Sequence, residues 1–519
     1  MNRPDYDVVI LGGGLAGGLL LRQLCLSRPD LRVLCCERQR ETSYKVGEAT
    51  VELFSNYLIR RLGLSSYLYE QQLPKNGLRF FFDREGRDAS LAQMSEIGSQ
   101  ALPYHPSFQL DRSTLERELR DGSRRLGGEI AEGAKVLAVE LAAPHHRVTF
   151  ADGGAERTVT TTWVVDASGR TGLLAKQLGL RVPVADHRCL AAWARARDVV
   201  DLDGANVDAA FRARVRNTSR RLSTVHFMER GYWIWLIPLK GGVTSVGIVG
   251  DARRLSRDVL TLAGLRRQLD GHRALRALLA PAEWLDFGGY GQLAYGTRRW
   301  FGDRWAVVGE AGAFTDPFYS PGSDFITLAN DYACDLIARH ADGEAIDARR
   351  ELYDGYLQFR YAANLPLYRD QYELFGSYDL VATKWNFDIA NYYALWLSSY
   401  LQDHHLDVDE LRHELRQSTF VLRTLGHFGA LFARVERAVT ERGDYRRNNL
   451  GRFAEGLADI DFLAAVGRMD RATAEAHSLA AFGRARARSF ALLDHRVADD
   501  DRPSLADFVN GRALQFAGA

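Results

Sequence analysis

Short runs of hydrophobic residues in the first third of the chain predict buried strands. Residues 6–11 (YDVVIL), 31–37 (LRVLCCE) and 163–166 (WVVD) are almost continuously apolar, as expected for strands that are covered on both faces of a parallel sheet. The leucine-rich segment from residue 15 to about residue 26 predicts a helix between the first two strands. This order of elements predicts a βαβ unit within an α/β fold.

The pattern changes twice further along the chain. Alternating runs in the middle predict a second, mostly antiparallel sheet, with strands at 223–227, 232–239 and 243–249. After about residue 337 the pattern becomes helical and rich in aromatic residues, and the tail at 406–519 reads as arginine- and alanine-rich amphipathic helix. The chain is therefore expected to contain more than one core, as its 519 residues also suggest.

A glycine-rich turn joins the first predicted strand to its helix. In the segment GGGLAG, Gly12, Gly14 and Gly17 stand where a dinucleotide-binding βαβ unit needs the backbone to approach a pyrophosphate. Glu37 closes the second strand, where an acid can bind ribose hydroxyls, and Arg38 follows it. Because the sequence has no second motif of this kind, we expect a permanently held FAD, with electrons supplied by a visiting nicotinamide or a separate flavin reductase.

These patterns predict an α/β architecture, α+β over the whole chain, in three parts. The first is a Rossmann-type FAD-binding domain. The second is an inserted, mostly antiparallel β-sheet domain for substrate, and the third is a C-terminal helical region. The expected boundaries are 1–72, 106–185 and 299–340 for the FAD-binding domain, 73–105 and 186–298 for the substrate domain, and 341–519 for the helical region.

The stretch from Trp300 to Ile326 organises the predicted site. A short apolar strand runs into Gly-Glu-Ala-Gly, then Asp316-Pro317, then a helix entered through Ser320-Pro321-Gly322. A helix N-terminus leaves backbone N–H groups unpaired and carries the positive end of the helix dipole. We therefore expect an anion or an electron-rich ring to lie against this segment. A second helix is expected to open at Lys45 to Ala49, where Glu48 could act as its cap.

Lysine is rare in this chain, which draws attention to Lys75. Only six of the 67 basic residues are lysines, and lysine alone offers a titratable, nucleophilic amine. An ammonium can polarise a bound electrophile through a hydrogen bond, while a neutral amine can act as a nucleophile. Burial would lower the pKa of this amine; the alternative is an ordinary solvated lysine in a loop.

Composition excludes several other functions. The net charge of +1 and the lack of a basic run argue against nucleic acid. No apolar run is long enough to span a membrane, and no secretion signal is visible. The five cysteines show no CxxC pair, which favours a reduced, cytoplasmic chain. The histidine pairs at 145–146 and 404–405 read as exposed turns, and no metal site is predicted.

Several motifs together give the chain a resemblance to the flavin-dependent halogenases, a group with the p-hydroxybenzoate hydroxylase-like fold. The resemblance covers roughly residues 5–340 and is carried by GGGLAG (12–17), VGEAT (46–50), Lys75 before LRFFF, DASGR (166–170), WIWLIP (233–238) and GEAGAFTDPFYSPG (309–322). It implies that reduced FAD and oxygen form a C4a-hydroperoxide. A halide attacks this species, and the hypohalous acid travels through the protein to Lys75 beside an electron-rich aromatic substrate.

The resemblance also implies a set of cofactor and halide residues. The expected FAD contacts are Gly12, Gly14, Leu15, Ala16, Gly17, Glu37, Arg38, Gly47, Glu48, Ala49, Thr50, Arg112, Val136, Asp166, Ala167, Gly169, Gly309, Glu310, Asp316, Pro317 and Gly322. The expected halide contacts are Ser320, Gly322 and Ser323. The sequence departs from the tryptophan-type members at two positions: Pro321 has no N–H for a halide, and Tyr319 replaces an acidic residue.

The departures leave two interpretations open. One is a halogenase, using chloride or bromide, for an electron-rich aromatic or conjugated molecule that is free or carrier-bound. The other is a flavin-dependent hydroxylase or oxidase without halide use. Apart from these two, the sequence also allows a flavin-binding scaffold without activity. Stacking of an aryl substrate is expected from an aromatic group that comprises Trp385, Phe387, Tyr392, Tyr393 and Trp396. The sequence leaves monomer and homodimer equally open.

Overall fold

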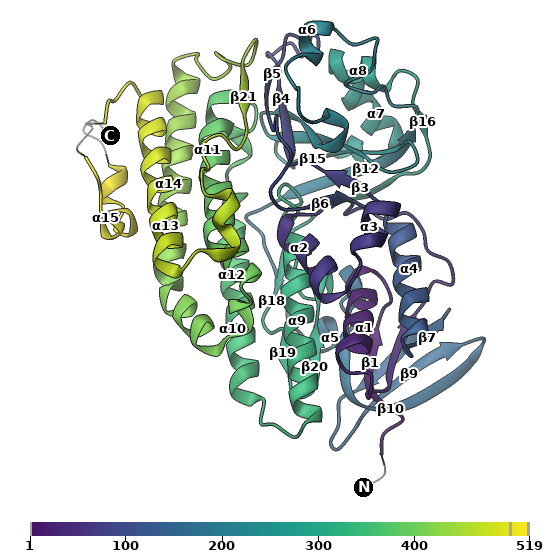
Figure 1. Cartoon of the computed structure of the whole chain (residues 1–519). Helices are drawn as coiled ribbons and strands as arrows, with labels where there is room; N and C mark the ends of the chain where they lie inside the picture. Colours follow the sequence, from purple (N-terminus) through teal and green to yellow (C-terminus); the bar gives the residue numbers. More distant parts are fainter. Residues whose placement is uncertain (1–2, 498–500, 516–519) are drawn as a thin grey trace.

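The computed structural model describes residues 3–497 and 501–515 and has three parts (Figure 1). The FAD-type sheet with its helices, drawn mainly in purple and blue, lies below a second sheet. The later helices, green to yellow, stand in a layer beside both. Within the described residues, no helix is long and apolar enough to cross a membrane. All five cysteines are free and buried.

The first sheet has eight strands built around a parallel core. Its central strands run in the order β20, β10, β1, β2, β7, and all four of these pairings are parallel. α1 follows β1 directly and packs against α4 and α9. The predicted βαβ unit and Rossmann-type arrangement are confirmed. The elements are β1 (Tyr6–Leu11), α1 (Leu15–Ser27), β2 (Val33–Glu37), α4 (Arg112–Arg125), β7 (Glu129–Glu132), β10 (Ala155–Asp166) and β20 (Trp305–Val307).

The second sheet has nine strands and is mostly antiparallel, as predicted. Trp233 and Trp235 of β14 share one face, with ring centroids 5.6 Å apart, while the alternating residues Ile234 and Leu236 are buried in a separate core on the other face. Gly247 of β15 faces Trp235 because a Cβ there would lie 2.2 Å from the indole. The main strands are β4 (Leu78–Phe82), β5 (Ser95–Gly98), β12 (Cys189–Arg197), β13 (Thr224–Glu229), β14 (Tyr232–Pro238) and β15 (Val243–Asp251).

The C-terminal part is helical with one exception. β21 (Phe453–Glu455) pairs in parallel with β5, so the tail completes the second sheet. The division at residue 341 stays a prediction, and β21 lies beyond it although it belongs to the second sheet. The helices are α9 (Pro321–Ala341), α10 (Asp347–Asn364), α11 (Tyr378–Asn391), α12 (Ser398–Leu401), α13 (Val408–Glu441), α14 (Arg471–Leu492) and α15 (Leu505–Val509).

Two local predictions are wrong. Lys45 to Ala49 is extended rather than helical, with Gly47 at φ +99°, and α2 (Glu52–Asn56) begins only after it. Glu48 therefore caps no helix. The histidine pairs are not simply exposed turns either, because His146 and His405 are buried and hydrogen-bond to the Arg304 carbonyl at 3.2 Å and to Asp331 at 2.9 Å.

Candidate active site

The glycine turn after β1 is shaped by close backbone approaches. A Cβ on Gly17 would lie 1.9 Å from the carbonyl oxygen of Gly12, and Gly12 itself has φ +105°. Only glycine satisfies both positions. At Gly14, by contrast, a Cβ would meet no atom within 4 Å. The protein thus leaves open space at the N-terminus of α1, where the phosphates of a dinucleotide bind.

Glu37 lies at the end of β2 beside this turn. Its carboxylate accepts the backbone N–H of Gly13 at 2.7 Å and that of Gln39 at 2.8 Å. Arg38 is exposed. Val136 lies half-buried in β8 (Lys135–Glu140), whose hairpin partner β9 (His146–Asp152) extends the same sheet. The three residues are at the sheet edge where the ribose and adenine of a dinucleotide are expected.

The turn after β10 is held by Asp166. This buried carboxylate accepts the backbone N–H of Ser168 at 2.9 Å and that of Leu174 at 2.7 Å. Its side chain therefore orders the turn instead of pointing to a ligand, which corrects the expected role. Ala167 packs under Gly12, and Gly169 has φ +62° with nothing within 4 Å of a Cβ.

A cavity of about 150 Å³ lies where the two sheets meet. We call it the Trp233 cavity. Trp233, Trp235 and Ile237 of β14 form one wall. Most of the predicted cofactor residues near a flavin ring line the remainder: Leu15, Gly47, Glu48, Ala49, Arg112, Glu310, Pro317, Ser320, Gly322 and Ser323. Ala16 and Gly309 lie just behind it, where a Cβ on Gly309 would be 3.0 Å from the Ala16 methyl group.

Two expected cofactor residues point elsewhere. The buried Asp316 carboxylate accepts from Tyr372 Oη at 2.6 Å and bonds His187 Nε2 at 3.0 Å, so only its neighbour Pro317 reaches the cavity. Thr50 Oγ1 accepts from the Phe108 N–H at 2.7 Å. The Asp316 carboxylate thus holds two buried side chains, Tyr372 and His187, and the Thr50 hydroxyl holds the backbone at Phe108. Cys189 lies near His187, and the three groups His187, Cys189 and Asp316 could converge on an ion.

Buried charges in the Trp233 cavity fit a polar cofactor. Burial raises the pKa values of Glu48 and Glu310. Glu48 Oε1 is buried and forms an ion pair with Arg195 Nη1 at 3.5 Å, with no closer hydrogen-bond partner among the described residues. Arg112 is held by the Val46 carbonyl at 2.9 Å and by Glu116 at 2.6 Å. The buried Glu48 and Glu310 carboxylates, a fixed guanidinium and the open glycine turn suit the donors and acceptors of FAD.

The expected halide segment starts α9. Ser320 has a left-handed backbone (φ +56°), and Pro321 is the first helical residue. Ser323 donates through both its N–H, at 3.2 Å, and its hydroxyl, at 2.8 Å, to the Ser320 carbonyl. Ser323 therefore has neither donor free for a halide, contrary to expectation. Gly322 and the Ser320 side chain are the remaining candidates on this wall.

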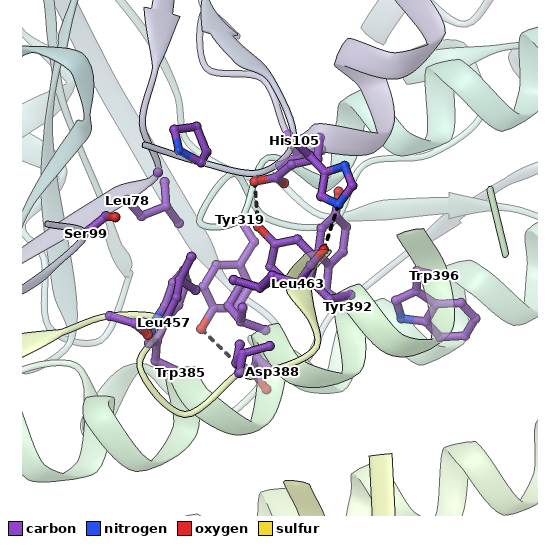
Figure 2. A pocket seen from close by; sticks show the side chains of 18 of the residues that line it. Leu78, Ser99, His105, Tyr319, Trp385, Asp388, Tyr392, Trp396, Leu457 and Leu463 are labelled. Carbon is purple, nitrogen blue, oxygen red and sulfur yellow. Dashed lines mark hydrogen bonds between the residues drawn. The ribbon is translucent and has the colours of Figure 1, made fainter. Parts of the chain in front are cut away.

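Lys75 lines a second cavity of about 380 Å³, which we call the Lys75 cavity (Figure 2). The residue ends β3 (Leu73–Lys75), which pairs with β6 (Ser107–Gln109), and its side chain is only 3% exposed. Its ammonium donates to the Thr50 carbonyl. Burial lowers the pKa of the amine to about 8, partly opposed by the Glu52 carboxylate. The reading of Lys75 as a solvated loop residue is wrong.

The two cavities share walls. Leu78, three residues after the lysine, lines both. The segment before α9 divides its residues between them: Tyr319 and Pro321 face the Lys75 cavity, while Ser320 and Gly322 face the Trp233 cavity. Leu78 and the turn at 319–322 thus form the wall between the two cavities.

Four of the five aromatic candidates line the Lys75 cavity: Trp385, Tyr392, Tyr393 and Trp396. Figure 2 shows Trp385, Tyr392 and Trp396 around it, with Tyr319 directed toward Asp388. The Tyr319 hydroxyl donates to Asp388 at 2.9 Å, and Lys384 pairs with the same carboxylate at 2.5 Å. Phe387 is the exception. It turns into a phenylalanine core, 4.4 Å from Phe428 between ring centroids, because α11 packs that face on α13.

Besides Glu455 of β21, sequence reasoning missed four charged residues of the Lys75 cavity. Glu52, Asp324, Arg360 and Asp388 all line it. They come from α2, α9, α10 and α11. In a sequence, a single buried charged residue within a helix cannot be distinguished from one that faces solvent. The position of Asp324, four residues after Ser320 in the first turn of α9, was the only available signal.

Comparison with known proteins agrees with this geometry. The family model for the FAD binding domain matches residues 5–273, and the chain belongs to that family. The chain is 27% identical over 452 residues to the flavin-dependent halogenase chlA of Dictyostelium discoideum, with 77% of this chain and 72% of that protein covered. It is 26% identical to the 1H-pyrrole-2-carbonyl-(peptidyl-carrier protein) chlorinase of Pseudomonas fluorescens, with 67% and 77% covered.

A solved structure extends the agreement to the whole fold. The halogenase PltM in complex with phloroglucinol and FAD superposes with a TM-score of 0.70 at 18% identity, covering 93% of this chain and 96% of that chain. The C-terminal helices are thus part of the shared fold. With the curated relatives, these matches identify the protein as an oxidoreductase of the flavin-dependent halogenase family.

Proposed function

We propose that the protein uses reduced FAD, oxygen and chloride or bromide to halogenate an electron-rich aromatic or conjugated substrate. The observation that carries this proposal is the buried Lys75, at the wall of an aromatic-lined cavity next to the cavity that fits a flavin ring. The substrate is free or tethered to a carrier protein, as in the pyrrole chlorinase among the relatives. A separate flavin reductase supplies the electrons.

Each part of the chain has a distinct task in this proposal. When bound, reduced FAD would supply two of the four electrons that reduce oxygen, and the halide would supply the other two as it is oxidised to hypohalous acid. The glycine turn and Glu37 hold the dinucleotide, while Arg112 and Glu310 orient its central part. Trp233 and Trp235 fill the space on one side of the ring site, which keeps an organic substrate away from it.

Lys75 transfers the halogen. Its ammonium donates a hydrogen bond to the oxygen of hypohalous acid and makes the halogen more electrophilic. With a pKa lowered to about 8 by burial, the amine is protonated at neutral pH yet gives up a proton more readily than a solvated lysine. It can therefore protonate the departing oxygen as the carbon–halogen bond forms.

One observation favours the alternative of a flavin-dependent hydroxylase without halide use. Pro321 has no N–H, and Ser323 has both donors engaged, so a halide would rely on Gly322 and Ser320. Trapping with monochlorodimedone separates the two functions. Purified protein with reduced FAD, oxygen and bromide should halogenate the trap. Hydrogen peroxide as the sole product in chloride and in bromide would contradict the proposal.

A further inference from the structure

Asp324 is a buried acid in the Lys75 cavity whose carboxylate the fold leaves unused. It is 8% exposed, and its Oδ1 atom is buried without a hydrogen-bond partner among the described residues. Buried polar atoms normally have a partner. The side chain leaves the first turn of α9 on the face of Pro321, toward the Lys75 cavity and away from the Trp233 cavity. The missing partner is therefore expected among molecules that enter this cavity.

Arg360 of α10 lies at the same cavity and is equally buried, with 8% exposure. Its guanidinium stacks 4.0 Å above the Trp396 ring and donates to the Tyr356 hydroxyl at 3.5 Å. A guanidinium in this position is fixed in orientation and remains charged at every relevant pH. An acid and a fixed cation together match a group that loses a proton and becomes an anion.

The acid and Lys75 face one space. The Glu52 carboxylate lies within electrostatic range of both, because it raises the pKa of Lys75 and that of Asp324. Glu52 itself accepts from the Tyr393 hydroxyl at 2.8 Å and is therefore already engaged. Asp388 also lines the cavity with an unpartnered Oδ1, but its Oδ2 is held by Lys384 and Tyr319. Among the described residues Asp324 is therefore the acid of this cavity that neither a cation nor a hydroxyl holds in place.

We propose that the substrate is a phenol and that Asp324 accepts the proton of its hydroxyl group while Arg360 stabilises the phenolate oxygen. This inference rests on the proposed halogenation and names its substrate class. A phenolate ring donates more electron density than a phenol ring to an incoming electrophile. Asp324 and Arg360 thus act at the phenol oxygen, whereas Lys75 delivers the halogen.

The step balances in atoms and electrons. The phenol O–H bond breaks and its proton moves to Asp324. A ring carbon then forms a bond to the halogen of hypohalous acid, the halogen–oxygen bond breaks, and the oxygen leaves as water with a proton from Lys75. The ring carbon loses its hydrogen as a proton to the neutral lysine. Asp324 returns its proton to the phenolate oxygen, so phenol and hypohalous acid give halophenol and water.

The pKa of Asp324 is suited to this role. Burial raises it from 3.8 to about 7, against the lowering effect of Arg360. The difference between the pKa of Asp324 and that of a phenol, which is about 10, thereby falls from about six units to about three. The ionisable groups that face Asp324 from the surrounding elements are Glu52, Arg360, Tyr368 and Tyr392, with Lys75 across the cavity.

The test compares the wild type with Asp324→Asn and Asp324→Glu, using 1,3,5-trihydroxybenzene and its trimethyl ether as probes. We expect Asp324→Asn to bind FAD and to halogenate the monochlorodimedone trap normally. Its kcat on the phenol should fall by about 10²- to 10⁴-fold, the usual contribution of a general base. The rising limb of the wild-type pH profile near pH 7 should move to the pKa of the phenol itself. Asp324→Glu should retain part of the activity.

The ether and the trap distinguish failure of the Asp324 role from failure of the proposed function. Wild type and Asp324→Asn should halogenate the trimethyl ether at the same low rate, because that probe has no proton to lose. An ether that reacts as fast as the phenol, or a phenol that Asp324→Asn halogenates at the wild-type rate with the same pH profile, would overturn the role of Asp324. If the wild type halogenates no trap at all, the proposed function fails and this inference fails with it.

Discussion

Replacing Lys75 with methionine removes the amine while keeping a side chain of similar length in the cavity. Two opposing effects on stability are expected. The Thr50 carbonyl loses its hydrogen bond, which costs about 1–3 kcal/mol for a buried acceptor. Burying the ammonium lowers its pKa from 10.5 to about 8, so removing this charge regains about 3 kcal/mol. The variant should therefore fold about as stably as the wild type at neutral pH.

The functional effect of Lys75→Met should be large and specific. We expect FAD binding and trap halogenation to persist, because the Trp233 cavity is formed by other residues. Halogenation of the substrate should fall by at least about 10²- to 10⁴-fold, the range for loss of an acid group at the reacting atoms. Lys75→Arg should be similarly impaired despite keeping the charge. Lys176→Met, at an exposed lysine, is the matched control.

Three measurements decide the matter: the flavin spectrum, the rate of trap halogenation, and the mass of the product. Normal product formation by Lys75→Met would refute the assignment. Stability offers an independent check. Because the unfolded chain binds the lysine proton more tightly than the native state, the free energy of unfolding should rise with pH between about 8 and 10.5. Lys75→Met should lack this rise, as denaturation at a series of pH values can establish.

Further substitutions test the residues that support the two cavities and the glycine turn. Lys384→Met should destabilise the protein by about 3–5 kcal/mol, because it leaves the buried Asp388 carboxylate without its cation; urea denaturation measures this, and a loss below about 1 kcal/mol would contradict it. Gly17→Ala should prevent stable folding or FAD binding, since its Cβ would collide with a carbonyl at 1.9 Å. Gly14→Ala meets no protein atom within 4 Å, so it should leave the apoprotein's melting temperature unchanged and weaken only FAD binding; an equal loss of stability in the two glycine variants would argue against the open turn.

Local sequence patterns predicted most of the fold because they report contacts between near neighbours. Continuous apolar runs gave the parallel sheet, and the i, i+2 spacing of Trp233 and Trp235 gave a shared face. The burial of Lys75 was predicted from chemistry and resemblance rather than from periodicity. The errors came where several hydrogen-bond partners compete. Thr50 and Asp316 stand in a cofactor motif, but a backbone N–H and a tyrosine hydroxyl already occupy their oxygens.

The charged half of the Lys75 cavity could not be predicted in this way. Glu52, Asp324 and Arg360 lie on three helices that are distant in sequence, and only the packing of α2, α9 and α10 brings them to one space. Phe387 shows the opposite error, because it was expected at the substrate site but lies in the core. It stands two residues from Trp385, in a strongly aromatic helix, yet the helical repeat turns it to the opposite face and into the core formed with α13 and α14.

The first turn of α9 contributes residues to both cavities, and each cavity has its own task in the proposed function. Ser320 and Gly322 face the cavity where halide would meet the flavin, whereas Pro321 and Asp324 face the cavity that holds Lys75. Because proline fixes its own φ and begins the helix, it also fixes which residues point to each side. The loss of one N–H at position 321 is thus accompanied by a rigid wall between the oxidant and the substrate. Under the proposed function, a hypohalous acid would have to pass side chains such as Leu78 to reach Lys75, while the same wall would hold back a larger aromatic substrate.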